Sequence, residues 1–140
     1  ALDPSTVSNG CLRVIPRSHA LRVTHPHLLE ERSDVTLQQR MAEGSFDEAQ
    51  AVDVELEPGQ MSMHDVYTIH GAKANVSAQR RTGVALRYMP GSSVFERDLD
   101  PVGGRSGVPV AFATRPLWLL RGADRTGRND FDVGFDGVRR

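Results

Sequence analysis

Alternating apolar and polar residues mark several short strands along the chain. In the segment VDVEL, residues 52–56, three apolar side chains alternate with two carboxylates, which is the period of a half-buried strand. Pro58-Gly59 follows and fits the central positions of a type II turn, while Asn9-Gly10 is a strong turn dipeptide. The same reasoning predicts further strands over residues 10–15, 60–69 and 81–89.

A different pattern occupies residues 17–50. Its segment VTLQQRMAE is rich in helix formers, whereas Pro26 and Gly44 interrupt the stretch, so we expect two short helices in a helical excursion. Connections this long usually cover a functional region. Short strands with one helical excursion predict a mainly β fold, most naturally a jelly roll.

Composition and charge exclude several classes of protein for this chain. The chain has 140 residues, enough for one domain, and its 17 basic and 18 acidic residues are interspersed, which argues against a nucleic-acid partner. The single cysteine, Cys11, excludes an internal disulfide and suits a reducing compartment. No apolar run approaches the roughly 18 residues of a membrane span. We therefore expect a cytoplasmic protein with no membrane partner.

The N-terminal segment ALDPSTVSNG lacks an initiator methionine and passes from a strand-like Ala-Leu directly into an Asp-Pro turn signal. This pattern predicts a chain that lacks the N-terminal part of its domain. Missing strands would leave sheet edges unpaired, so homo-oligomers formed through strand edges are an expected consequence.

Two histidines precede the polar connection around residues 71–80. If residues 60–70 form one strand, His64 and His70 project to the same face, because side chains alternate along a strand. Neutral imidazole is a common ligand for iron, copper or zinc. Two histidines at this spacing more often face solvent or form structural hydrogen bonds, so the spacing alone favours that interpretation over metal binding while leaving both open.

Two arginines stand at the start of the following strand. Arg80 and Arg81 are predicted to point to opposite faces, and the small residues Gly83 and Ala85 share the parity of Arg81. A buried guanidinium requires a partner, because an unpaired buried charge is costly. A bound dicarboxylic acid would provide one through two parallel hydrogen bonds, and so would an acidic residue of the chain itself.

Three ordered motifs resemble one protein family. The segment IHGAKANVSAQRRTGVALRYMP, residues 69–90, resembles the distal half of the phytanoyl-CoA dioxygenase family of Fe(II)/2-oxoglutarate oxygenases. NGCLRVIPRSH is similar to that family's NG-x-L-x-(V)-I-P-G-S-H segment, and RPLWLLRGADRTG to its closing strand. The resemblance implies a double-stranded β-helix jelly roll whose C-terminal part is residues 1–122, followed by an irregular tail over residues 123–140.

The resemblance also implies an activity, hydroxylation of a small organic substrate by an Fe(II)/2-oxoglutarate-dependent dioxygenase. Fe(II) would be the cofactor and 2-oxoglutarate the cosubstrate, with His70 as the distal iron ligand and Arg81 binding the far carboxylate of 2-oxoglutarate. A planar guanidinium matches that carboxylate, and a neutral imidazole suits ferrous iron. His64 is expected to pack rather than to ligate.

Several neighbouring residues have expected structural roles. Asn75 and Ser77 should shape their turn, and His19 should tether the backbone near the excursion. Arg17 stands where the family usually has glycine, which places the conformation of that turn in question.

One element of the family's iron site is absent from the sequence. Besides the distal histidine, the family's iron site has two ligands that come from a His-x-Asp motif. In this sequence none of the five histidines is followed two residues later by Asp or Glu. Iron affinity of this chain alone should be weak, and hydroxylation and halogenation remain alternatives because the deciding carboxylate is not in the chain. The alternative class is a non-catalytic module, cupin-like or carboxylate-binding, although the sequence has no His-x-His with a following glutamate.

Overall fold

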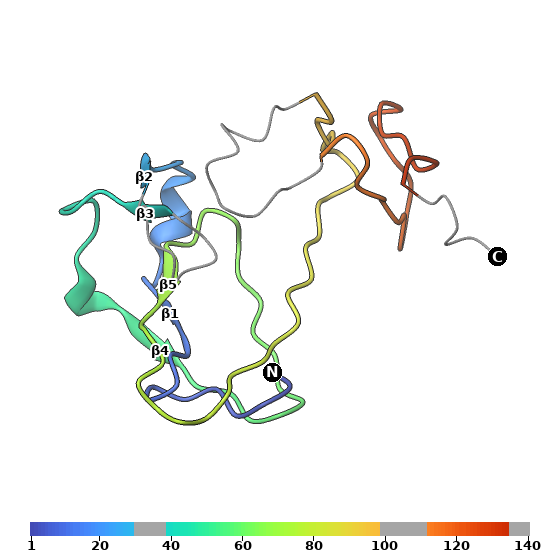
Figure 1. Ribbon diagram of the computed structural model, residues 1–140. Coiled ribbons are helices and arrows are strands. Elements are labelled where there is room, and N and C mark those ends of the chain that lie inside the picture. Colours follow the sequence, from blue (N-terminus) through green and yellow to red (C-terminus); the bar gives the residue numbers. More distant parts are fainter. Residues whose placement is uncertain (30–38, 99–111, 135–140) are drawn as a thin grey trace. The chain divides into compact units, whose positions relative to one another are not determined.

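The computed structural model describes residues 1–29, 39–98 and 112–134 (Figure 1). By internal contacts the chain divides into two compact units, the first formed by residues 1–26 and 41–86 and the second by residues 27–40 and 87–140. The elements of the described residues are β1 (Leu12–Val14), the 3-10 turn η1 (Ser18–Leu21), β2 (His27–Leu29), β3 (Gln39–Met41), the 3-10 turn η2 (Glu48–Gln50), β4 (Val52–Val54) and β5 (His70–Ala72). The predicted mainly β character is confirmed.

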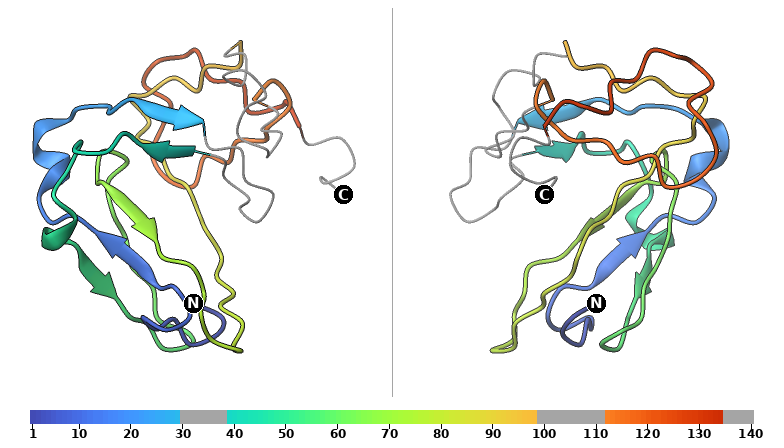
Figure 2. Two further views of the ribbon diagram at one scale, coloured as in Figure 1. Left: turned by 60° about the vertical axis from the view of Figure 1, so that its left-hand side comes forward. Right: turned by 90° about the vertical axis from the view of Figure 1, so that its right-hand side faces the viewer.

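The first unit is built on a three-stranded antiparallel sheet in which β1 lies between β4 and β5 (Figure 2). Val14 is opposite His70 on β5 and Val52 on β4, so these side chains share one face of the sheet. Arg13 projects from the other face and pairs with Asp53 and Glu48, at 2.8 Å in each case.

A buried polar turn leads into β1. Asn9 is 1% exposed, and its side chain accepts a hydrogen bond from the Thr6 amide at 2.7 Å and donates one to the Pro4 carbonyl at 2.8 Å. Gly10 has a φ of 77°, and a Cβ atom at this position would collide with the carbonyl oxygen of Lys73. The predicted Asn-Gly turn is therefore confirmed, and its conformation requires glycine.

Two predicted strands and one predicted turn are also confirmed. β1 lies within the range predicted over residues 10–15, and β4 begins the range predicted over residues 52–56. At the Pro58-Gly59 turn the Gln60 amide donates to the Glu57 carbonyl at 3.0 Å, and Gly59 has a φ of 88°. These values are those of a type II turn.

The strand predicted over residues 60–69 is wrong. Regular pairing starts only at His70, because a turn over residues 65–68 takes the backbone groups that a strand ladder would use. The Asp65 side chain accepts from the Tyr67 amide at 2.9 Å, and the Thr68 amide donates to the Asp65 carbonyl at 3.0 Å. The Asp65 side chain thus stabilises a turn in place of a strand, and the alternation of apolar and polar residues does not reveal this.

The strand predicted over residues 81–89 is wrong as well. Thr82 bonds to residues 2 and 3, but no sheet ladder forms over residues 81–89. Val84, Leu86 and Tyr88, which share one parity, are 65–69% exposed. A segment with alternating apolar and polar residues forms a strand only when a neighbouring strand pairs with it, and the described residues contain no such partner for this segment.

The helical excursion contains less helix than predicted. Its described residues hold the 3-10 turns η1 and η2, and Gln39–Met41 of the expected helical segment forms β3, paired with β2. Residues 35–38 lie outside the described ranges. Pairing with β2 overrides the weak helix propensity of this segment.

In the second unit, the closing strand that the resemblance implied over residues 115–127 is wrong: these residues form no strand, and a turn over residues 112–115 lies at their start. The Arg97 guanidinium donates to three carbonyl oxygens of this turn, those of Phe112 (3.3 Å), Ala113 (3.2 Å) and Arg115 (2.8 Å). A side chain therefore stabilises the turn that starts this segment.

Residues 123–134 contain no helix or strand, but a carboxylate organises part of them. Asp124 accepts from the backbone amide and hydroxyl of Thr126 and from the backbone and side-chain nitrogens of Asn129, at 2.7–3.1 Å. Asn129 in turn bonds to the Ser93 carbonyl and the Phe95 amide. Side-chain hydrogen bonds therefore replace regular structure in this segment.

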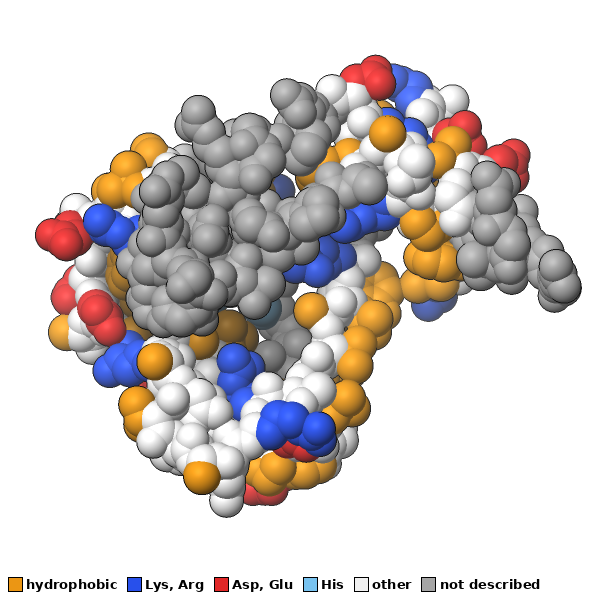
Figure 3. Space-filling model, in the orientation of Figure 1, with side chains coloured by type: hydrophobic (Ala, Val, Ile, Leu, Met, Phe, Trp, Pro, Cys, Tyr) orange, Lys and Arg blue, Asp and Glu red, His pale blue; other side chains and the backbone are white. Residues whose placement is uncertain are grey.

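Apolar side chains are abundant on the face of the molecule shown in Figure 3, where basic and acidic groups lie among them. Among the described residues, Cys11 and Ile15 are the buried apolar side chains, at 1% and 8% exposure. Within the same residues no helix combines the length and apolar character needed to cross a membrane.

Candidate functional site

His70 is the first residue of β5, and its ring is held by the backbone just before it. Nδ1 lies 2.7 Å from the carbonyl oxygen of Thr68. A carbonyl oxygen can only accept, so Nδ1 carries the proton in this contact. The side chain is exposed, and Nε2 is left as the nitrogen that could bind a metal ion.

His64 lies against His70. Their ring centroids are 4.6 Å apart and the ring planes are inclined by 53°. The sequence predicted a common face through strand parity, whereas the structure brings the rings together through the turn over residues 65–68. Burial, followed by the proximity of His70, lowers the pKa of His64 and favours its neutral form.

An open hollow lies beside this histidine pair in the first unit. It has a volume of about 390 Å³ and is bordered by β1, η1, β4 and the segment before β5. Its lining residues are Leu12, Val14, Ile15, Pro16, Arg17, His19, Val54, Ser62, Met63, His64, Asp65 and Thr68. Because Val14 and His70 share a sheet face, the hollow and the candidate metal ligand are on the same side of the sheet.

Ser18 fixes the residue that precedes His70. Its hydroxyl donates to the Ile15 carbonyl and accepts from the Ile69 amide, both at 2.8 Å, and the Ile15 amide donates to the Ile69 carbonyl at 2.9 Å. The tether that sequence reasoning gave to His19 is thus made by Ser18. A serine directly after a turn is the signal that could have identified it.

Arg17 adopts a backbone conformation that favours glycine, the residue that the family's motif usually has at this position. Its φ of 65° and ψ of 0° lie in the left-handed region, where a side chain is unfavourable. Arg17 therefore carries backbone strain that a glycine at this position would not.

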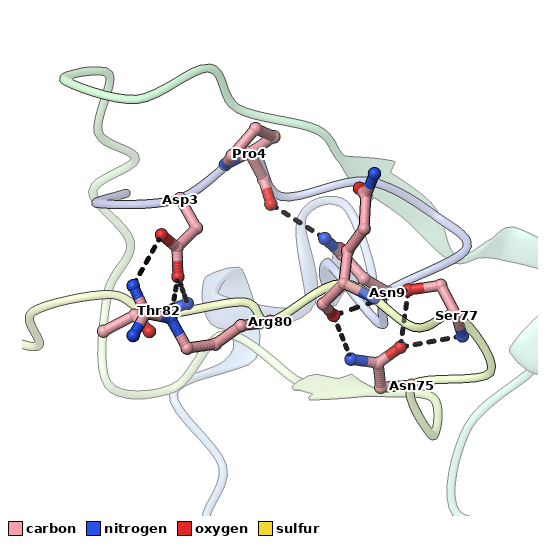
Figure 4. A network of polar contacts seen from close by, with 8 residues as sticks. Asp3, Pro4, Asn9, Asn75, Ser77, Arg80 and Thr82 are labelled. Atoms are coloured by element: carbon pink, nitrogen blue, oxygen red, sulfur yellow. Dashed lines mark hydrogen bonds and ion pairs between the residues drawn. The ribbon is translucent and has the colours of Figure 1, made fainter.

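The two arginines have different partners. Arg80 donates to Asp3 through Nε at 2.9 Å and through Nη2 at 3.2 Å, as Figure 4 shows. Arg81 has no acidic partner among the described residues, although its positive charge acts to lower the pKa of the Cys11 thiol. The pKa of that thiol is nevertheless raised, above all by burial and then by Asp53 and Glu55.

Asn75 and Ser77 shape the turn between β5 and the arginines, as predicted. The Asn75 side chain accepts from the Ser77 amide and hydroxyl, both at 2.9 Å, and donates to the Gln79 carbonyl at 2.7 Å (Figure 4). These bonds fix the path of the chain toward Arg80.

The described residues do not by themselves make a complete iron site. Across residues 1–29, 39–98 and 112–134, no three His, Cys, Asp or Glu side chains converge in an arrangement that could hold a metal ion. His70 is joined to His64 by a ring contact, but no hydrogen bond or ion pair joins it to Arg81.

Comparison with known proteins shows the family of this chain. The family model described as phytanoyl-CoA dioxygenase (PhyH) matches residues 1–83, more than half of the chain, and this range includes His70 and Arg81. The chain belongs to the phytanoyl-CoA dioxygenase family. Phytanoyl-CoA dioxygenases are known as Fe(II)/2-oxoglutarate oxygenases, so this chain comes from an oxygenase family.

A curated relative agrees with the family match. The phytanoyl-CoA dioxygenase domain-containing protein 1 homolog of Dictyostelium discoideum is 24% identical over 102 residues, which cover 70% of this chain and 36% of the relative. The aligned part thus spans about a third of the relative's length. No solved structure matches the chain.

Proposed function

We propose that this chain provides the distal iron ligand, His70, and the 2-oxoglutarate-binding arginine, Arg81, of an Fe(II)/2-oxoglutarate-dependent dioxygenase that hydroxylates a small organic substrate. The proposal includes a jelly-roll domain with residues 1–122 as its C-terminal part and residues 123–140 as a tail. The observation that carries it is the different engagement of two adjacent arginines within the family's matched range.

The arginine assignment follows from charge pairing. Asp3 takes the charge of Arg80, whereas Arg81 keeps its guanidinium free of any described acidic group. A free guanidinium offers two parallel donors to a carboxylate, the arrangement that 2-oxoglutarate would use. Since Arg81 is exposed, solvent screens this interaction, and we expect weak binding by the chain alone.

The histidine assignment rests on the free Nε2 of His70. The Thr68 carbonyl holds Nδ1, which fixes the ring orientation and leaves Nε2 available to a metal ion. When bound in such a site, ferrous iron supplies the oxidising chemistry, while the protein positions the reactants. The described residues hold too few converging ligands for us to assign any step through the metal.

The arginine assignment is tested by titrating the isotopically labelled chain with 2-oxoglutarate, without iron, and following amide chemical shifts. Arg81→Ala should weaken binding at least tenfold, because it removes the charged fork. Arg80→Ala is the matched control and should change the Kd by less than about twofold, because its exposed ion pair contributes little. Equal effects of the two substitutions, or no binding by the unmodified chain, would refute the assignment.

The histidine assignment is tested by anaerobic titration with Fe(II) and 2-oxoglutarate, following the visible charge-transfer band of the chelated keto acid. His70→Ala should abolish any band, whereas His64→Gln should preserve most of it. If the His64 substitution alone removed the band, the wrong histidine would have been assigned.

A second function deserves the same titrations, namely a carboxylate-binding module that catalyses nothing. The absence of a three-ligand cluster among the described residues favours it. Binding of 2-oxoglutarate through Arg81 with no iron-dependent band, in a protein shown to be folded, would support this module over the oxygenase.

A further inference from the structure

The carboxylate of Asp3 holds the residues on both sides of Arg81. Its Oδ2 accepts from Arg80 Nε and from the Thr82 amide, both at 2.9 Å, and its Oδ1 accepts from Arg80 Nη2 at 3.2 Å (Figure 4). The Asp3 side chain is 20% exposed, and that of Arg80 is 80% exposed. One partly exposed carboxylate therefore connects to positions 80 and 82.

The backbone strengthens the same connection. The amides of Leu2 and Asp3 donate to the Thr82 carbonyl at 2.9 and 3.2 Å. Thr82 is thus held through its amide by the side chain of Asp3 and through its carbonyl by the neighbouring backbone. Rotation of the peptide groups on either side of Thr82, the first of which joins it to Arg81, would break these bonds.

Asp3 is itself held in place by the buried turn that follows it. Pro4 restricts the backbone of the preceding residue to extended conformations. The Pro4 carbonyl accepts a hydrogen bond from the buried Asn9 side chain at 2.8 Å. A rigid N-terminal segment thus presents the carboxylate to residues 80–82.

We infer that Asp3 is a positioning residue for Arg81: it fixes the backbone at Thr82, directly after this arginine, and thereby helps to orient the guanidinium of Arg81 toward a dicarboxylic acid ligand. The inference rests on the proposed function of Arg81. A side chain ordered before binding loses less conformational freedom when the ligand arrives, which improves affinity without any contact between Asp3 and the ligand.

The carboxylate form of Asp3 is strongly favoured in the folded chain. The Arg80 side chain, followed by the side chain and then the amide of Thr82, holds the pKa of Asp3 well below its usual range. The Arg80 contact is largely exposed to solvent, so we assign the positioning effect mainly to the bond with the Thr82 amide. Asparagine at position 3 could retain one acceptor for that amide, whereas alanine could not.

The experiment compares the unmodified chain with Asp3→Ala, Asp3→Asn and Arg81→Ala in two measurements. The first is the Kd for 2-oxoglutarate, and the second is the ¹⁵N order parameter of the Arg81 amide and Nε without ligand. Glu48→Ala is the matched control, because Glu48 is another surface carboxylate paired with an arginine, Arg13.

Asp3→Ala should lower the order of Arg81 and raise the Kd roughly three- to tenfold. Asp3→Asn should lie between this variant and the unmodified chain, while Glu48→Ala should leave both quantities unchanged. The Asn variant also keeps the test decisive if the Ala variant does not fold.

The failures of the two proposals are distinguishable. If Arg81→Ala abolishes binding but the Asp3 substitutions leave the order of Arg81 or the Kd unchanged, the positioning role is refuted while the function of Arg81 stands. If the unmodified chain does not bind 2-oxoglutarate, or Arg81→Ala binds it equally well, the proposed function fails and the positioning role fails with it.

Discussion

Removing the hydroxyl of Ser18 should loosen the backbone at the candidate iron ligand. This hydroxyl is the bridge between the turn after β1 and Ile69, the residue that precedes His70. Ser18→Ala deletes two hydrogen bonds of 2.8 Å, one donated to the Ile15 carbonyl and one accepted from the Ile69 amide. Both bonds are partly buried, so solvent replaces them incompletely.

The two losses have different costs. The Ile15 carbonyl still accepts from the Ser18 amide at 3.3 Å, so it is not left without a partner. The Ile69 amide loses its acceptor, and an unsatisfied buried donor costs roughly 1–3 kcal/mol. Because this amide is only partly buried, we expect the free energy of unfolding to fall by about 1–2 kcal/mol.

Urea unfolding measures this change, and amide hydrogen exchange locates it. Ser8→Ala is the control, since the Ser8 hydroxyl contacts Thr6 Oγ1 at 3.1 Å on the exposed surface. Its substitution should stay within about 0.5 kcal/mol of the unmodified chain. Exchange of the Ile69 amide should accelerate in Ser18→Ala and not in Ser8→Ala. Equal stability of the two variants, or unchanged protection of Ile69, would refute this reasoning.

Two further substitutions and one pH titration test other features. Arg17→Gly should stabilise the chain by about 0.5–1 kcal/mol in urea unfolding, because it relieves a left-handed side chain at some cost in unfolded-state entropy; a lower midpoint would contradict this. Gly10→Ala should destabilise it by more than about 1 kcal/mol, since its Cβ atom would meet the Lys73 carbonyl at a positive φ, and a neutral result would disprove that contact. The Thr126 hydroxyl, followed by nearby amides, lowers the pKa of Asp124, so this stabilisation is present above the unfolded carboxyl pKa near ~4 and disappears as the pH falls through the lower folded value. In an NMR titration the Asp124 carboxyl should remain ionised at about pH 3, where an unperturbed aspartate is mostly protonated; a midpoint near 4 would contradict the assignment.

The confirmed predictions concern local chemistry. Asn9-Gly10 and Pro58-Gly59 determine turns through residues adjacent in sequence, and Asn75 does the same through its own side chain. The two short strands β1 and β4 were predictable because apolar alternation coincides with a pairing partner. Signals of this kind need no knowledge of distant parts of the chain.

The wrong predictions depended on partners that a sequence pattern does not specify. Residues 81–89 alternate well but have no pairing strand among the described residues, and residues 60–69 are interrupted by the Asp65 side chain. The contact between His64 and His70 was expected from strand parity, yet a turn produces it. Similarly, nothing local in the sequence indicates that Asp3 reaches position 82.

Each part of the candidate site is held in place by the hydrogen bonds of a single polar side chain. Ser18 fixes the approach to His70, Asp3 fixes the surroundings of Arg81, and Asn75 fixes the turn between them. None of these three bonds is a sheet hydrogen bond, and the apolar residues buried in the described core are Cys11 and Ile15. Side chains make the bonds that orient the site, whereas backbone groups make the bonds that form the sheet. Substituting one hydroxyl or carboxylate should therefore disturb the site locally while the sheet stays folded.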